Sequence, residues 1–132
     1  MATELIICDT DVLIDYLDDA KIRHKSVKDI LENSISLNNV VLSSITKMEL
    51  FLGADNKREL NLIDKSLKRF GALMLNQEIS EKSIELIKKY NLSHGLLIPD
   101  SLIAATAIIT DLPLFTYNLR DFKFIKGLKL FQ

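Results

Sequence analysis

The stretch ELIICDTDVLIDYLDD, residues 4–19, decides the fold class of this chain. An apolar run ends at Asp9, and a second acid, Asp11, comes just before another apolar run. The first run predicts a buried strand at 4–9, and the second predicts a short helix at 11–19. The two aspartates at this junction have two explanations. They cap the helix, or they form one wall of a metal site.

Predicted strands and helices alternate along the rest of the chain. Apolar runs predict further strands at 38–44, 72–76, 112–118 and 127–131. Apolar residues at helical spacing predict helices at 22–37, 44–55, 56–70, 79–93 and 99–110. This order predicts one α/β domain over residues 1–132, with three α/β/α layers and a mainly parallel sheet of about five strands.

The composition is that of an ordinary globular protein of 132 residues, with 48% hydrophobic and 27% charged residues. The net charge of -1 lacks the overall positive charge of many nucleic-acid binders, although a local basic rim is compatible with it. Cys8 is the only cysteine, so no intrachain disulfide can form. The start MATELIICD does not look like a signal peptide, and no apolar run is long enough to span a membrane. We therefore expect a cytoplasmic protein with no membrane contact.

Four acids lie at the ends of predicted strands or at the starts of predicted helices: Asp9, Glu49, Asp100 and Asp121. Ligands of parallel sheets bind outside the carboxyl ends of the strands, so one sheet edge can gather all four side chains. Four neighbouring carboxylates repel one another unless a cation neutralises them, and carboxylates suit Mg²⁺ or Mn²⁺. The two histidines have no partner at zinc-ligand spacing.

Each acid also has a purely structural explanation. Asp9 or Asp11 can cap the helix that follows, and Thr46–Glu49 matches the capping-box pattern. Asp100 can be stabilised by a helix dipole, and Asp121 can begin a turn or a short final helix.

Four segments, taken in chain order, resemble the PIN-domain ribonucleases, and specifically the VapC-type toxins of toxin–antitoxin pairs: IICDTDVLIDYL, SSITKMEL, PDSLIAATAI and LFTYNLRDF. The resemblance implies metal-dependent endonucleolytic cleavage of RNA, with a metal-activated water as the attacking group. It implies that Asp9, Glu49, Asp100 and Asp121 are both the catalytic and the metal-binding residues, with Mg²⁺ or Mn²⁺ as the cofactor. Asp121 is expected to act through a water.

The same resemblance assigns supporting roles to Thr10, Thr46, Thr116 and Asn118. Asp11 departs from the family, where Asn or Ser is common at this position. Three roles stay open for Asp11: it binds metal through water, it raises the number of bound ions, or it caps the helix.

The resemblance also implies partners. RNA is the substrate, and Lys47 and Arg120 are candidate phosphate contacts because they adjoin proposed site residues. A small antitoxin is expected to place its tail in a groove near the site, and Phe51 and Leu62 are candidate exposed apolar residues for it. A homodimer is expected.

Two other functions are compatible with parts of the sequence. A haloacid-dehalogenase-like phosphoryl-transfer enzyme also has a D-x-D motif after its first strand, but it needs a later lysine, a distal acidic pair and a longer core. A catalytically silent PIN-like binding domain is the other alternative. The sequence does not select the RNA, the antitoxin or the number of metal ions.

Overall fold

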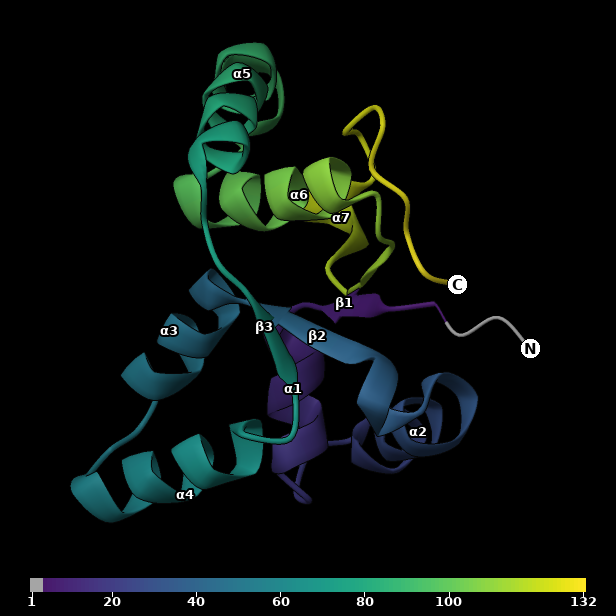
Figure 1. Cartoon of the computed structure of the whole chain (residues 1–132), viewed down its shortest axis with the longest axis vertical. Coiled ribbons are helices and arrows are strands. Elements are labelled where there is room, and N and C mark those ends of the chain that lie inside the picture. Colours follow the sequence, from purple (N-terminus) through teal and green to yellow (C-terminus); the bar gives the residue numbers. More distant parts are fainter. Residues whose placement is uncertain (1–3) are drawn as a thin grey trace.

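The computed structural model describes residues 4–132 and contains a parallel sheet between two layers of helices (Figure 1). The sheet has four strands in the order β3-β2-β1-β4, and every neighbouring pair is parallel. The strands are β1 Ile6–Cys8, β2 Val40–Ser43, β3 Gly71–Leu73 and β4 Leu114–Phe115. The predicted α/β/α architecture is therefore confirmed.

Helices connect the strands, as the alternating pattern predicts. The α-helices are α1 Thr10–Leu17, α2 His24–Asp29, α3 Ser44–Leu52, α4 Lys57–Leu67, α5 Gln77–His94, α6 Ile98–Thr110 and α7 Leu119–Phe122. A π-helical segment, Ile30–Ile35, and a short 3-10 helix, Leu37–Asn39, lie between α2 and β2.

The central strand β1 is buried on both faces. Its successive side chains point alternately into two hydrophobic cores. Ile6 and Cys8 belong to the core that contains Val12 and Leu13 of α1. Ile7 belongs to the opposite core, which is built mainly from α5 and α6. Figure 1 shows α5 and α6 on one face of the sheet and α1, α2 and α4 on the other. This burial explains why the strand reads as a continuous apolar run.

Small side chains let α6 pack closely against its neighbours. Ala104, Ala105 and Ala107 are fully or almost fully buried. Gly95 ends α5 in the left-handed conformation, with φ of 72°, which glycine adopts without steric cost. The chain then turns into α6, whose first turn carries Asp100.

Several predicted elements differ from the observed ones, and the strand predicted at 112–118 is confined to Leu114–Phe115. The segment 127–131 is not a full strand, because Gly127 turns the chain with φ of 87° and only Leu130 forms a bridge, to Leu114. The helix predicted at 22–37 begins at His24 and changes to π-helical and 3-10 geometry, so Asn39 ends a helical turn instead of opening a strand. The strand predicted at 72–76 is shifted to Gly71–Leu73 at the sheet edge.

No helix within residues 4–132 combines the length and the apolar character that crossing a membrane requires.

Candidate active site

Asp9 stands directly after β1 and is the N-cap of α1, so its capping explanation is correct. One carboxylate oxygen, Oδ1, accepts a hydrogen bond from the backbone N–H of Thr10 at 2.8 Å. The other oxygen, Oδ2, accepts one from the hydroxyl of Thr116 at 2.8 Å. Asp9 is only 4% exposed. The carboxylate is therefore fixed at the carboxyl edge of the sheet by α1 and by the residue that follows β4.

The carboxylate of Asp11 connects the same two segments by accepting hydrogen bonds from their backbone N–H groups. Its Oδ1 accepts from the N–H of Val12 at 2.8 Å, and its Oδ2 accepts from the N–H of Tyr117 at 3.0 Å. Of the roles left open by the sequence, the contact with the helix start is thus present. A metal-binding role for Asp11 stays a prediction.

Glu49 reaches this edge from α3. The pattern Thr46–Glu49 does not form a capping box, because α3 begins one residue after Ser43, whose hydroxyl accepts from the N–H of Ile45. Instead, the hydroxyl of Thr10 donates to Oε1 of Glu49 at 2.6 Å. The Thr10 hydroxyl also lies 3.1 Å from that of Thr46, which is fully buried. Residues far apart in the sequence therefore orient the Glu49 carboxylate.

The remaining predicted residues lie on α6, on α7 and on the segment before α7. Asp100 is in the first turn of α6, and Asp121 is in α7. Asn118 takes part through its backbone, since its N–H donates to the hydroxyl of Thr116 at 2.9 Å. Within the part of the chain that the structure describes, neither of the candidate phosphate contacts, Lys47 and Arg120, makes a hydrogen bond or ion pair with a site carboxylate.

The acids influence one another electrostatically. Burial, followed by the charge of Asp11, raises the pKa of Asp9 to about 7, against the opposing hydrogen bonds from Thr116 and Thr10. Burial, followed by the charges of Asp121, Glu49 and Asp11, raises the pKa of Asp100 to about 6. Burial is also the main reason for the raised pKa of Asp11. The four predicted acids and Asp11 therefore share one region of negative potential.

The donor chemistry of this region fits a hard divalent cation. Among residues 4–132, no group of three or more His, Cys, Asp or Glu side chains could hold an ion as the side chains stand. Mg²⁺ does not need such a group, because it usually keeps several waters and binds through one or two carboxylates. A cation would also relieve the repulsion that raises these pKa values. Asp9, Glu49 and Asp100 are the candidates, and one or two of them would bind the ion directly.

Sequence reasoning missed one network beside the acids. Asp15 on α1 is buried, and its Oδ2 accepts from Nε of Arg23 at 2.7 Å. The guanidinium of Arg23 lies over the ring of Tyr117, with Cζ 4.2 Å from the ring centroid. A buried charge is rarely left alone, but the burial of Asp15 depends on how α2 packs against α1, so no pattern in the sequence predicts this pair.

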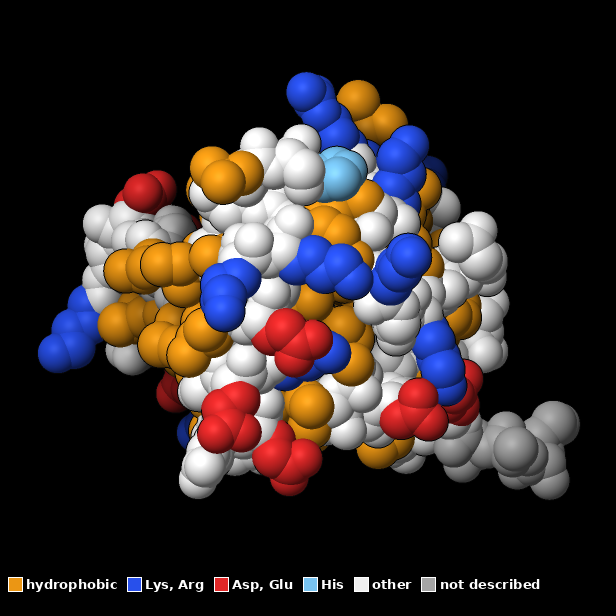
Figure 2. Space-filling model, turned by 90° about the horizontal axis from the view of Figure 1, so that it is seen from above, with side chains coloured by type: hydrophobic (Ala, Val, Ile, Leu, Met, Phe, Trp, Pro, Cys, Tyr) orange, Lys and Arg blue, Asp and Glu red, His pale blue; other side chains and the backbone are white. Residues whose placement is uncertain are grey.

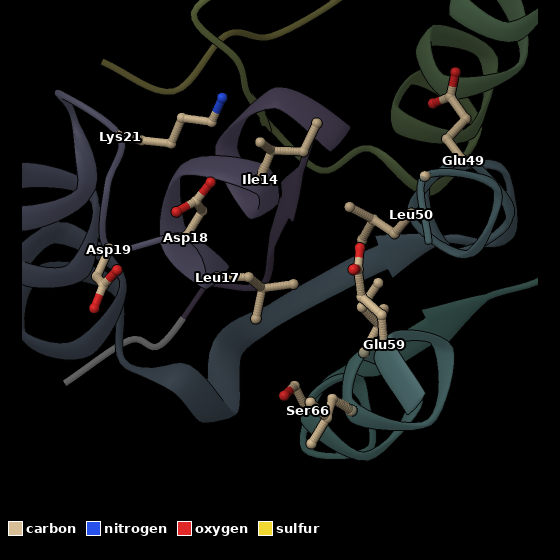
Figure 3. Close-up of a pocket in the computed structure, with 12 residues that line it drawn as sticks. Ile14, Leu17, Asp18, Asp19, Lys21, Glu49, Leu50, Glu59 and Ser66 are labelled. Atoms are coloured by element: carbon tan, nitrogen blue, oxygen red, sulfur yellow. The ribbon is translucent and has the colours of Figure 1, made fainter. Parts of the chain in front are cut away.

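A pocket of about 630 Å³ lies beside the carboxylates, between α1, α3 and α4. Figure 3 shows Ile14 and Leu17 of α1, Leu50 of α3, and Glu59 and Ser66 of α4 around it. Glu49 is also among its lining residues, so the pocket adjoins the candidate active site.

Comparisons with known proteins agree with this architecture. A family profile described as PIN domain matches residues 6–128. "Ribonuclease VapC1" of Methanocaldococcus jannaschii is 28% identical, over 96% of this chain and 87% of that protein. "Ribonuclease VapC19" of Mycobacterium tuberculosis is 26% identical, over 92% of this chain and 94% of that protein. A chain in the structure "Toxin-antitoxin complex from Klebsiella pneumoniae" is 28% identical with a TM-score of 0.74, covering 93% of this chain and 94% of that chain. Because the family profile spans nearly the whole sequence, this chain belongs to the PIN-domain family.

Proposed function

We propose that the protein is a metal-dependent endoribonuclease and the toxin component of a toxin–antitoxin system. One observation carries the proposal: a buried carboxylate, Asp9, is held by two hydrogen bonds at a sheet edge where Asp100, Asp121 and Glu49 add further negative charge. The similarity to proteins named ribonuclease VapC supports RNA as the substrate. Because the chain belongs to the PIN-domain family, the haloacid-dehalogenase-like alternative is excluded.

The side chains of the site have distinct tasks in this proposal. Bound Mg²⁺ or Mn²⁺ would supply Lewis-acid stabilisation of the phosphate and a more acidic water. Asp9, Glu49 and Asp100 would hold the cation, and Asp121 would act through a water. Thr116 fixes the carboxylate of Asp9, while Thr10 fixes that of Glu49.

No protein nucleophile is needed for this reaction. Burial raises the pKa of the only cysteine, Cys8, well above its usual range, so its thiol stays protonated. In this proposal the attacking group is water.

The pocket between α1, α3 and α4 supports an antitoxin partner. Its apolar lining residues are Ile14, Leu17, Leu50, Leu62 and Ile63, and its acidic ones are Asp18, Asp19, Glu49 and Glu59. Such a surface fits a segment with an apolar face and basic side chains, which is the helix-in-groove mode of recognition. Of the two predicted contacts, Leu62 lines the pocket. The prediction that Phe51 is exposed is wrong, because its side chain is partly buried against the core.

The outer face of α5 supports the expected homodimer. Ile84 is 62% exposed and lines an apolar groove with Ile98 and Leu102 of α6. Glu81 precedes Ile84 by about one helical turn, and Lys88 follows it by about one turn. Two antiparallel copies of α5 related by a twofold axis therefore place each Glu81 beside the other Lys88, with Ile84 at the centre. Seen from above, the molecule has hydrophobic side chains interspersed with basic and acidic ones (Figure 2).

Incubation of total cellular RNA with the purified protein tests the nuclease proposal. Discrete cuts are expected with Mg²⁺ or Mn²⁺, and no cuts are expected with EDTA or with Asp9→Asn. Cuts that persist in Asp9→Asn indicate a contaminating nuclease. A folded, metal-loaded protein that binds RNA without cutting it favours the catalytically silent binding domain. The cytoplasmic location and the single domain over 1–132 stay predictions.

A further inference from the structure

Arg23 is an anchored cation on the flank of the carboxylate site. Its Nε donates to Oδ2 of Asp15 at 2.7 Å, and the Asp15 side chain is only 9% exposed. The guanidinium lies over the ring of Tyr117 at 4.2 Å from the centroid. The buried carboxylate and the aromatic face fix the orientation of the guanidinium, so it loses little conformational entropy when it binds a ligand.

The outer end of this guanidinium remains available. The Arg23 side chain is 46% exposed, and within residues 4–132 its Nη1 and Nη2 atoms make no hydrogen bond or ion pair. The Nη groups of arginine form a planar set of donors that matches the oxygens of a phosphate. A pre-oriented guanidinium on a half-exposed side chain, with its terminal donors unpaired in the described part of the chain, is suited to bind an anion from solvent.

Arg23 lies next to the segment that holds the carboxylate site together. Tyr117, which lies under the guanidinium, follows Thr116, the residue that holds the Asp9 carboxylate. The N–H of Tyr117 donates to Asp11, and the charge of Arg23 partly offsets the burial that raises the pKa of Asp11. Arg23 is therefore within electrostatic range of the acids, and it introduces a positive charge where those acids would repel an RNA strand.

We propose that Arg23, stacked on Tyr117, forms a binding site for a backbone phosphate of the RNA strand, next to the nucleotide that is cleaved. The site reads the phosphate rather than the base, so it adds affinity without sequence preference. This inference rests on the proposed ribonuclease function. Arg23 is a substrate-binding residue here and takes no part in the chemical step.

Binding of a single-stranded RNA oligonucleotide in EDTA, measured by fluorescence anisotropy at several salt concentrations, tests the proposal without cleavage. Arg23→Gln is expected to weaken binding about tenfold. It is also expected to make the slope of log affinity against log salt less steep, by the amount that corresponds to the loss of about one phosphate contact. Arg23→Lys keeps the charge and can still pair with Asp15, so it is expected to recover part of the affinity. The matched control is Lys25→Gln, an exposed position on the same helix, with an effect below about twofold.

Cleavage kinetics provide a second readout. Arg23→Gln is expected to raise KM about tenfold and to change kcat by less than about twofold, because the contact acts on binding. Thermal melts show whether each variant is folded. If Arg23→Gln is unfolded, Arg23→Lys is used in its place. If wild-type protein cuts RNA and both Arg23 variants bind like Lys25→Gln, this inference fails alone. If wild-type protein neither binds nor cuts RNA, the proposed function fails with it. Inorganic phosphate and unlabelled oligonucleotide are also compared as competitors of the bound RNA. If both compete at equal concentrations, Arg23 belongs to a site for small anions, and the assignment to RNA is overturned.

Discussion

Asp9→Asn is expected to stabilise the metal-free protein above neutral pH while abolishing its activity. The pKa of Asp9 is raised from 3.8 to about 7, first by burial and then by the charge of Asp11. Because the folded state holds this proton more tightly than the unfolded chain, the stability contributed by the group is complete below pH 3.8. That stability is lost as the pH rises through about 7.

The size of the effect follows from the two pKa values and the local hydrogen bonds. The ionised carboxyl disfavours the folded state by about 4 kcal/mol at pH 8. Asparagine can still accept from the N–H of Thr10 and can donate to the Thr116 hydroxyl, but the poorer bonding costs about 1–2 kcal/mol. The net gain is therefore about 2 kcal/mol, which raises Tm by about 8 °C in a chain of this size.

Thermal unfolding followed by circular dichroism, in EDTA at pH 4 and pH 8, measures this difference. The gain in Tm is expected at pH 8 and is expected to vanish or reverse at pH 4. Asp64→Asn, at an exposed position of α4, is the matched control and is expected to leave Tm unchanged within about 2 °C. Addition of Mg²⁺ is expected to raise Tm of the wild type more than that of Asp9→Asn. A variant that is less stable than wild type at pH 8, or equally altered at both pH values, refutes the electrostatic reasoning.

Three further predictions concern the orientation of Glu49, the dimer face and the groove. Thr10→Val removes the hydroxyl that binds Glu49 and is expected to slow RNA cleavage about 10–100-fold, with Thr10→Ser restoring most of the rate; equal rates for the Val and Ser variants contradict this role. Ile84→Asp is expected to convert a dimer to a monomer in sedimentation velocity, whereas the same change at the fully exposed Ile22 is not, and loss of the dimer in both variants argues against the α5 face. Leu62→Asp is expected to weaken binding of the cognate antitoxin by about 2 kcal/mol in calorimetry without changing cleavage, and unchanged affinity places the antitoxin elsewhere.

The order of elements could be predicted from the sequence because apolar runs and helical spacing report burial directly. Ile6, Ile7 and Cys8 form a central strand because both faces of the sheet are covered, and this is visible as an unbroken apolar run. The segment around Leu130 has the same local pattern, yet it forms only one bridge. Pairing along a strand depends on where the neighbouring strand runs, which a local pattern does not encode.

The candidate site was predictable to the level of residue type and sheet edge. Sequence alone gave both Asp9 and Glu49 a capping explanation, and only the structure separated them: Asp9 caps its helix, whereas Glu49 binds Thr10 and not its own helix start. The pair formed by Asp15 and Arg23 was missed because it depends on how α2 packs against α1. Contacts between separate elements are set by tertiary packing, and no short motif announces them.

We propose above that the clustered carboxylates carry out metal-dependent cleavage of RNA. The most direct measurement is the single-turnover cleavage rate of one mapped RNA in Mg²⁺, for wild type, Asp100→Asn and the control Asp64→Asn. We expect Asp100→Asn to lower the rate at least about 100-fold, because it removes a carboxylate from the proposed metal site, and Asp64→Asn to cleave like wild type. Equal rates for Asp100→Asn and wild type, from protein free of contaminating nuclease, would show that Asp100 is not part of the catalytic metal site.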